Sequence, residues 1–255
     1  MPLRAHLTEL RKRFVRSAIA ILLGAVGGWY LYKPVFEAAA KPIIDIQRER
    51  GVTASINFSN VAGAFNLQIQ TAIVIGFVIA SPVWLYQLWA FITPGLTRRE
   101  RKSSIGFLAA AVPLFLGGAA LAWVVLPKAI DFLYEFIPQG GSAITDASIY
   151  FSFVTRIVLA FGIAFVTPVV LVSLNLVGML PGKTLLRHWR IIVFVCFLFA
   201  AIATPTPEAT SMIVLAAALC LLFAIAVGIC LLADRRKARR APDLESIPDD
   251  TASPL

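Results

Sequence analysis

The pattern of long apolar segments separated by short polar ones predicts a chain of membrane-spanning helices. These apolar segments are continuous, unlike the roughly ten-residue alternating segments of a membrane β-barrel. We therefore expect an all-α polytopic membrane protein in which residues 1–233 contain six transmembrane helices. The expected spans cover approximately residues 17–35, 66–91, 104–126, 149–179, 191–203 and 209–233.

Prolines and segment lengths add detail to this pattern. Pro82 cannot donate a helical hydrogen bond, so the second span should kink at Ser81–Pro82. The fifth span is short for a hydrocarbon core ~30 Å thick, and it should lie in thinned lipid or break early at the prolines that follow. Residues 37–65 are expected to form a polar loop with short helical potential, and residues 234–255 a disordered tail.

The first 16 residues carry Leu3, Leu7, Leu10 and Phe14 along one face of a helix whose other face is mostly basic. Such a helix lies on a membrane surface. Because basic residues precede the first span and residues 38–40 are all alanine, a cleaved signal peptide is an alternative. We favour a retained span, since five basic residues on an amphipathic helix make an unusual start for a signal peptide.

Composition and charge agree with a membrane protein and suggest its orientation. The chain is 59% hydrophobic and only 15% charged, whereas soluble domains average about 25% charged. Seventeen of the 23 lysines and arginines fall on the side of the membrane that would hold both termini. By the positive-inside rule, both termini are expected in the cytoplasm.

No catalytic arrangement emerges from the sequence. His6 and His188 are both expected in the cytoplasm, so no histidine would reach a serine nucleophile within the bilayer. All three cysteines lie in apolar segments, away from the histidines. We expect no enzyme activity, cofactor or metal, and no nucleic acid binding without a soluble domain. Arg156 is the one charge expected inside the membrane, since Lys33 at the end of the first span is counted with the outer loops, and we favour snorkelling over a functional role for Arg156.

Two carboxylates on the basic cytoplasmic face are candidates for ligand binding. Apart from Asp234 and the tail, Glu9 and Glu100 are the only acids expected there. A carboxylate is a bidentate acceptor for guanidinium, so this pair could hold two neighbouring arginines of a ligand. Structural roles compete: Glu9 lies four residues before Arg13, and Glu100 completes a capping box that begins at Thr97. From spacing alone, the structural roles are favoured.

Several short motifs favour a ligand-binding role for Glu9 and Glu100. They are His6–Arg13 (HLTELRKR), Lys41–Ile43 (KPI), Ser81–Pro82, Trp89–Leu96 (WAFITPGL), Glu100–Lys102 (ERK), Ala160–Phe165 (AFGIAF) with Pro168, and Thr204–Pro207 (TPTP). Together, from His6 to about Ala233, they resemble the TatC family, the multi-span core of the twin-arginine protein translocase.

The resemblance implies a concave, glove-like arrangement of six tilted helices in the cytoplasmic membrane of a prokaryote. It implies a receptor for signal peptides with consecutive arginines, which belong to folded cargo exported by the proton-motive force. The implied partners are TatA, TatB where it is present, membrane lipids and further copies of the chain. The implied signal-peptide contacts are Glu9 and Glu100, with Arg11, Arg13, Phe91 and Pro94 shaping the site. The implied transport or partner contacts are Pro42, Glu208 and Thr167.

Two departures from the resemblance keep alternatives open. Many relatives carry a glutamate where this chain has Val166 or Thr167, and another around Ala224. Losing an intramembrane carboxylate removes a polar contact for partner helices, although Thr167 could supply a weaker hydrogen bond. A non-translocating membrane scaffold is therefore one alternative. A small-solute secondary transporter is another, and the acid-free spans argue against it.

Overall fold

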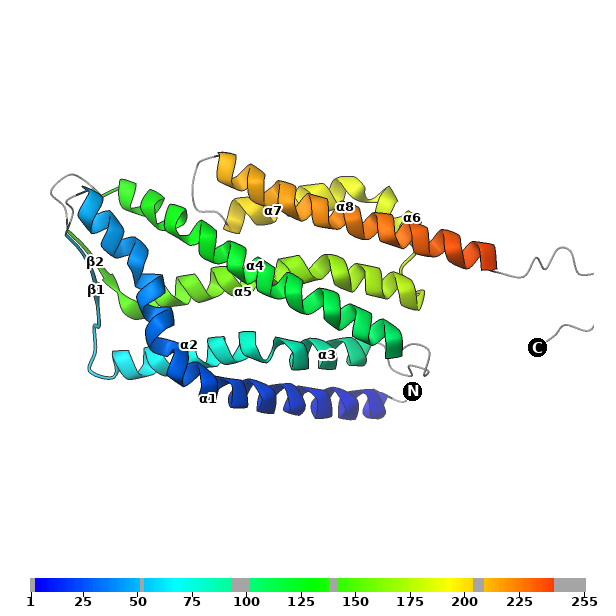
Figure 1. Ribbon diagram of the computed structural model, residues 1–255, viewed down its shortest axis with the longest axis horizontal. Helices are drawn as coiled ribbons and strands as arrows, with labels where there is room; N and C mark the ends of the chain where they lie inside the picture. The colour runs from blue at the N-terminus through cyan, green and yellow to red at the C-terminus, as the bar shows by residue number, and fades with distance from the viewer. Residues whose placement is uncertain (1–2, 51–52, 93–100, 138–141, 204–208, 241–255) are drawn as a thin grey trace, which may run out of the picture.

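The computed structural model describes residues 3–50, 53–92, 101–137, 142–203 and 209–240, and most of them are helical. The elements in chain order are α1 (Leu3–Arg50), β1 (Thr53–Asn57), α2 (Gly63–Ile79), α3 (Ser81–Ile92), α4 (Arg101–Glu135), β2 (Ser142–Asp146), α5 (Ala147–Val177), α6 (Gly182–Arg187), α7 (Trp189–Ala203) and α8 (Ala209–Arg240). The start of α1 and the end of α8 lie at one end of the molecule, and both strands lie at the other (Figure 1).

The helices confirm an all-α membrane protein. In the described part of the chain, α1, α4, α5 and α8 are each long and apolar enough to cross a membrane. The pair α2 and α3 can form a further span that is bent by 62°, which confirms the kink expected at Ser81–Pro82. α7 has 15 residues, fewer than the ~20 that a spanning helix needs. The count of six spans stays a prediction.

Three helices are longer than the sequence predicted. α1 has 48 residues, so the polar loop expected from residue 37 is helical up to Arg50, and the expected surface helix is simply the first part of α1. The third span continues as helix to Glu135. α8 continues to Arg240, so the expectation of disorder from Asp234 was wrong over residues 234–240.

The extension of α8 is held against the end of α5 by polar contacts. The Asp234 carboxylate accepts hydrogen bonds from Asn175 Nδ2 (2.9 Å) and from the backbone N–H of Gly182 (2.7 Å). Lys237 Nζ donates to the carbonyls of Asn175 (3.1 Å) and Leu176 (2.8 Å). Carbonyls in the last turn of a helix have no helical partner, so this lysine caps α5. These contacts explain why the helix continues beyond the apolar span.

A short parallel pair of strands joins two connections far apart in the sequence. Thr53–Asn57 pairs in register with Ser142–Asp146. Asp146 then begins α5, since its Oδ1 accepts hydrogen bonds from the backbone N–H groups two and three residues on (2.8 and 3.2 Å). Its Oδ2 accepts a hydrogen bond from the hydroxyl of Ser59, which follows β1. Neither strand was expected from the sequence.

Small residues let α1 and α2 pack backbone against backbone. A Cβ added to Gly28 would lie 2.4 Å from the carbonyl oxygen of Ala72, and one added to Gly24 would lie 2.7 Å from that of Gly76. The two positions on each helix are four residues apart, which is the small-xxx-small spacing typical of membrane helix pairs. The long first helix is therefore fixed against the second at its middle.

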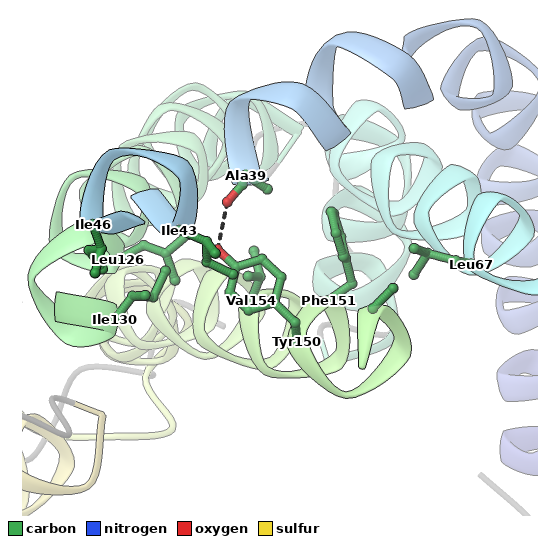
Figure 2. Close-up of a cluster of buried hydrophobic side chains, with 10 residues drawn as sticks. Ala39, Ile43, Ile46, Leu67, Leu126, Ile130, Tyr150, Phe151 and Val154 are labelled. Carbon is green, nitrogen blue, oxygen red and sulfur yellow. Dashed lines mark hydrogen bonds between the residues drawn. The ribbon is translucent and has the colours of Figure 1, made fainter. Parts of the chain in front are cut away.

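A cluster of buried side chains joins α1, α2, α4 and α5 (Figure 2). Ile43 from α1 packs with Leu126 from α4 and Val154 from α5. The hydroxyl of Tyr150 donates a hydrogen bond to the carbonyl oxygen of Ala39 at 2.5 Å, drawn as the dashed line in Figure 2. This contact ties α5 to the part of α1 that the sequence analysis expected to be a loop.

Candidate functional site

A cavity of about 240 Å³ lies between the first part of α1 and the α2–α3 pair. Most of its lining is apolar, and Arg13, Ser17 and Gln87 contribute polar groups. The lining residues are Leu10, Arg13, Phe14, Ser17, Ile21, Phe77, Trp84, Gln87, Leu88 and Phe91.

Helical periodicity explains how these residues come to face one cavity. On α1, Leu10, Phe14 and Ile21 are separated by four and seven residues, so they share one face of the helix. On α3, Trp84 and Phe91 are seven residues apart and also share a face. The apolar stripe that the sequence predicted at the N-terminus thus faces a neighbouring helix over Leu10 and Phe14.

Glu9 and Arg13 form an ion pair at the edge of this cavity. Arg13 Nη2 lies 2.5 Å and Nε lies 3.1 Å from Glu9 Oε1. The side chains of Arg13 and Glu9 remain 21% and 28% exposed, so the pair is open to a ligand. Both contacts end on Oε1, and a carboxylate has about four acceptor positions. Glu9 can therefore accept another guanidinium through Oε2 without losing Arg13.

Gln87 is a site residue that the sequence analysis missed. Its side chain lines the cavity, and its buried Oε1 accepts no hydrogen bond from the described residues. An unpaired buried acceptor costs about 1–3 kcal/mol, so a ligand N–H that reached this oxygen would gain more than at an exposed position. The signal was available, since Gln87 is a polar residue four positions before Phe91 on an otherwise apolar face.

Aromatic contacts hold α3 in position. Trp89 is fully buried and stacks on Phe107 of α4, with 4.8 Å between ring centroids. Trp84 stacks on Phe77 at 4.7 Å, and its Nε1 donates to the Phe77 carbonyl oxygen at 2.9 Å. That hydrogen bond bridges the bend at Pro82, where proline provides no backbone donor. The bend and these rings together aim the cavity-lining face of α3 at α1.

The structure brings together part of the predicted signal-peptide site. Arg13 and Phe91 line the cavity, and Glu9 is bonded to Arg13. Arg11 is exposed and does not line the cavity. The predicted contacts that lie outside the described residues are Pro94 and Glu100.

Comparison with known proteins identifies relatives over nearly the whole chain. Residues 5–217 match the family described as Sec-independent protein translocase protein (TatC). A protein of that name from Xylanimonas cellulosilytica is 47% identical over 240 residues, which cover 94% of this chain and 87% of the relative. Another from Aquifex aeolicus is 36% identical over 240 residues, covering 93% and 98%. A crystal structure of the twin-arginine translocase receptor TatC matches with a TM-score of 0.69 and 34% identity, covering 90% of this chain and 100% of that one.

This chain belongs to the TatC family. The resemblance drawn from its motifs is therefore confirmed, and its fold is that of solved TatC structures. The family is a component of a protein translocase, in agreement with a role in protein transport. Among the residues that the structure describes, no group of three or more His, Cys, Asp or Glu could hold a metal ion.

The structure distinguishes Val166 from Thr167, the two alternative places for the fourth-span glutamate that the resemblance implies for many relatives. Val166 is buried among the apolar side chains that join α3, α4 and α5. Thr167 is exposed and lines a separate cavity of about 300 Å³ between α5, α7 and α8. Its hydroxyl donates to the carbonyl oxygen of Ile163 at 3.0 Å, within its own helix. Position 167, and not 166, thus faces the surface available to another helix.

The other predicted contacts of this TatC chain are spread over the molecule. Pro42 lies near the opposite end, where it lines a charged cavity of about 450 Å³ between α1 and α4. Ala224 is exposed on α8. Glu208 lies outside the described residues.

Proposed function

We propose that this chain is the signal-peptide receptor of a twin-arginine translocase and takes part in exporting folded proteins across the cytoplasmic membrane, driven by the proton-motive force. Membership of the TatC family and the likeness to a crystal structure of a twin-arginine translocase receptor support this function. The proposed partners are TatA, TatB where it is present, membrane lipids and further copies of the chain. Both termini would lie in the cytoplasm.

The observation that carries the proposal is the position of Glu9 beside an apolar cavity. The carboxylate is oriented by Arg13, which itself lines that cavity. A peptide that carries arginines next to apolar residues matches both features. Its guanidinium can bond to Glu9 Oε2, and an adjacent apolar side chain can enter between Leu10 and Phe91. Burying one such side chain contributes about 1.5–3 kcal/mol.

The same geometry accounts for a preference for arginine over lysine. A guanidinium offers two parallel N–H donors to a carboxylate, whereas an ammonium is a point charge without that fork. Arg13 already directs two N–H groups, Nε and Nη2, to the single oxygen Oε1 of Glu9, and a ligand guanidinium can direct two N–H groups to Oε2 in the same way. Glu100 is proposed to bind the second arginine, and Gln87 Oε1 to accept a further N–H from the peptide.

Photo-crosslinking in membranes tests the receptor role. A photoreactive residue at Leu88, which lines the cavity, or beside Glu100 would be combined with a cargo signal peptide carrying Arg-Arg or Lys-Lys. We expect a crosslink with Arg-Arg that decreases at least tenfold with Lys-Lys, in line with a difference of about 1.4 kcal/mol. Equal crosslinking by the two peptides would contradict the proposal.

Glu9→Gln should weaken signal-peptide binding about ten- to hundredfold, because it removes a charge-assisted hydrogen bond worth about 1.5–3 kcal/mol. Glu37→Gln is the matched control, since Glu37 is an exposed acid near the other end of α1. Binding is measured as the concentration dependence of the crosslink.

Combining Glu9→Ala with Glu100→Ala should abolish export and leave the protein inserted. Unchanged export by this double variant would contradict the proposed receptor function.

A further inference from the structure

Two cavities lie one after the other along α1 and α4, toward the end of the molecule that carries the strands. The first, of about 450 Å³, is charged and is lined by Lys41 and Asp45 of α1 and by Lys128 and Asp131 of α4. The second, of about 360 Å³, is lined almost entirely by apolar side chains of α1, α2, α4 and α5. Trp123 lines both cavities and therefore marks their boundary.

The dimensions of this pair match one leaflet of a bilayer. The lining residues of α4 run from Ala119 in the apolar cavity to Asp131 in the charged one. Twelve residues of helix rise by about 18 Å, and half of a ~30 Å hydrocarbon core is about 15 Å. All lining residues of the apolar cavity except Ala39 fall within the predicted spans, and Lys128 and Asp131 lie just beyond the third one. The lining therefore changes from charged residues, through Trp123, to apolar residues, an order that fits the headgroup, glycerol and acyl chain of a phospholipid.

We propose that these two cavities form a binding site for one phospholipid whose headgroup carries both a phosphate and a primary amine, of the phosphatidylethanolamine type. Lys41 and Lys128 bind the phosphate, and Asp45 and Asp131 accept hydrogen bonds from the ammonium group. Trp123 lies at the level of the glycerol, the position that tryptophan favours in membrane proteins. One acyl chain fills the apolar cavity.

The mixture of charges selects this headgroup over others. Two lysines alone would suit any anionic lipid, but the two carboxylates in the same cavity cancel their charge, so a headgroup with net negative charge gains no net attraction there. A quaternary amine has no N–H to donate to those carboxylates. A water-soluble phosphate compound would leave the apolar cavity unused. The cavity beside Glu9 shares no residue with this site, so the lipid proposal does not depend on the signal-peptide proposal.

Native mass spectrometry of the purified full-length protein tests the site. The protein in detergent is mixed with equal amounts of palmitoyl-oleoyl phosphatidylethanolamine, phosphatidylcholine and phosphatidylglycerol, and separately with free phosphoethanolamine. We expect the phosphatidylethanolamine adduct to exceed the other two lipid adducts at least tenfold, and no adduct with phosphoethanolamine. Equal adducts with all three lipids, or a phosphoethanolamine adduct as abundant as the lipid adduct, would overturn the proposal.

Variants in each cavity separate binding from folding. Combining Lys41→Gln with Lys128→Gln should reduce the phosphatidylethanolamine adduct at least tenfold, whereas Lys33→Gln, an exposed lysine of α1 outside the cavity, should not.

Ala120→Phe should reduce the same adduct by filling the apolar cavity from an exposed position of α4. Val124→Phe, on the same helix and outside both cavities, is its control. Retention of the adduct by both the lysine variant and Ala120→Phe would overturn the proposal, and so would an equal loss in the controls.

Discussion

At Glu9, a structural role is compatible with the proposed ligand-binding role. The four-residue spacing between Glu9 and Arg13 suggested that Glu9 forms an ion pair within its helix, as an alternative to binding a ligand. The ion pair is present, but it occupies only Oε1 of the carboxylate. Arg13 thereby orients Glu9 and does not occupy Oε2, the oxygen that we propose accepts a ligand guanidinium. The two interpretations were never exclusive, and only the placement of individual atoms could show this.

Asp146 should make stability depend on pH at the end of the molecule that carries the strands. The hydroxyl of Ser59, followed by the backbone N–H of Ile149, donates to its carboxylate and lowers its pKa. Because the pKa is lower in the folded state, this contribution is complete above the unfolded pKa and is lost as pH falls through the folded pKa. Thermal unfolding between roughly pH 7 and pH 3 would show the loss.

Asp146→Asn is the informative variant, because asparagine also caps helices well but does not titrate. We expect the midpoint temperature of this variant to fall less steeply with acidification than that of the unaltered protein. Glu37→Gln serves as a control at an exposed acid of α1. An unchanged pH profile in Asp146→Asn would show that other carboxylates dominate.

At the scale of elements, the packing of α1 on α2 depends on particular glycines. A Cβ at Gly28 would meet the Ala72 carbonyl oxygen at 2.4 Å, whereas the nearest neighbour to one at Gly27 is Ile79 Cδ1 at 3.9 Å. Gly28→Ala should therefore destabilise the protein by about 1–3 kcal/mol through overpacking. Gly27→Ala gains the same helix propensity without the clash. Thermal unfolding in detergent compares the two, and equal midpoints would contradict the close packing.

The contact between α5 and α8 makes a second prediction at this scale. Asp234→Ala leaves the buried Asn175 amide and the Gly182 N–H without their shared acceptor. We expect a loss of about 1–3 kcal/mol in the free energy of unfolding and faster proteolysis after residue 233. Arg236→Ala, at an exposed position in the same turn, should have little effect. If both variants behave alike, the contact does not hold the end of α8.

Element boundaries show where sequence reasoning succeeded and where it failed. The kink at Pro82 was predictable because a missing backbone donor is a local property. The helical continuations to Arg50 and Arg240 were not, because their polar surfaces are stabilised by distant contacts. Tyr150 bonds to the carbonyl of Ala39, and Asn175 bonds to Asp234 across 59 positions of sequence. The parallel strands were missed for the same reason, since each strand pairs with a segment that is distant in the sequence.

At the scale of the whole molecule, the charge distribution predicts a cytoplasmic location for both termini. The start of α1 and the end of α8 lie at the same end of the structure (Figure 1), which this prediction requires. Green fluorescent protein fused to the C-terminus should fluoresce, and alkaline phosphatase fused there should be inactive, because the first matures in the cytoplasm and the second outside it. The reverse result would overturn the orientation.

The sequence by itself determined the membrane class, the family and the two carboxylates proposed to bind arginine. Those features depend on composition, on periodicity and on short motifs, which are all local in the chain. Only the tertiary structure decided that Arg13 occupies one oxygen of Glu9, that Gln87 faces the same cavity, and that position 167 is exposed while 166 is buried. It also placed two lysines and two aspartates from separate helices around one cavity. Such relations depend on how helices rotate and cross, and packing across the whole chain sets those angles.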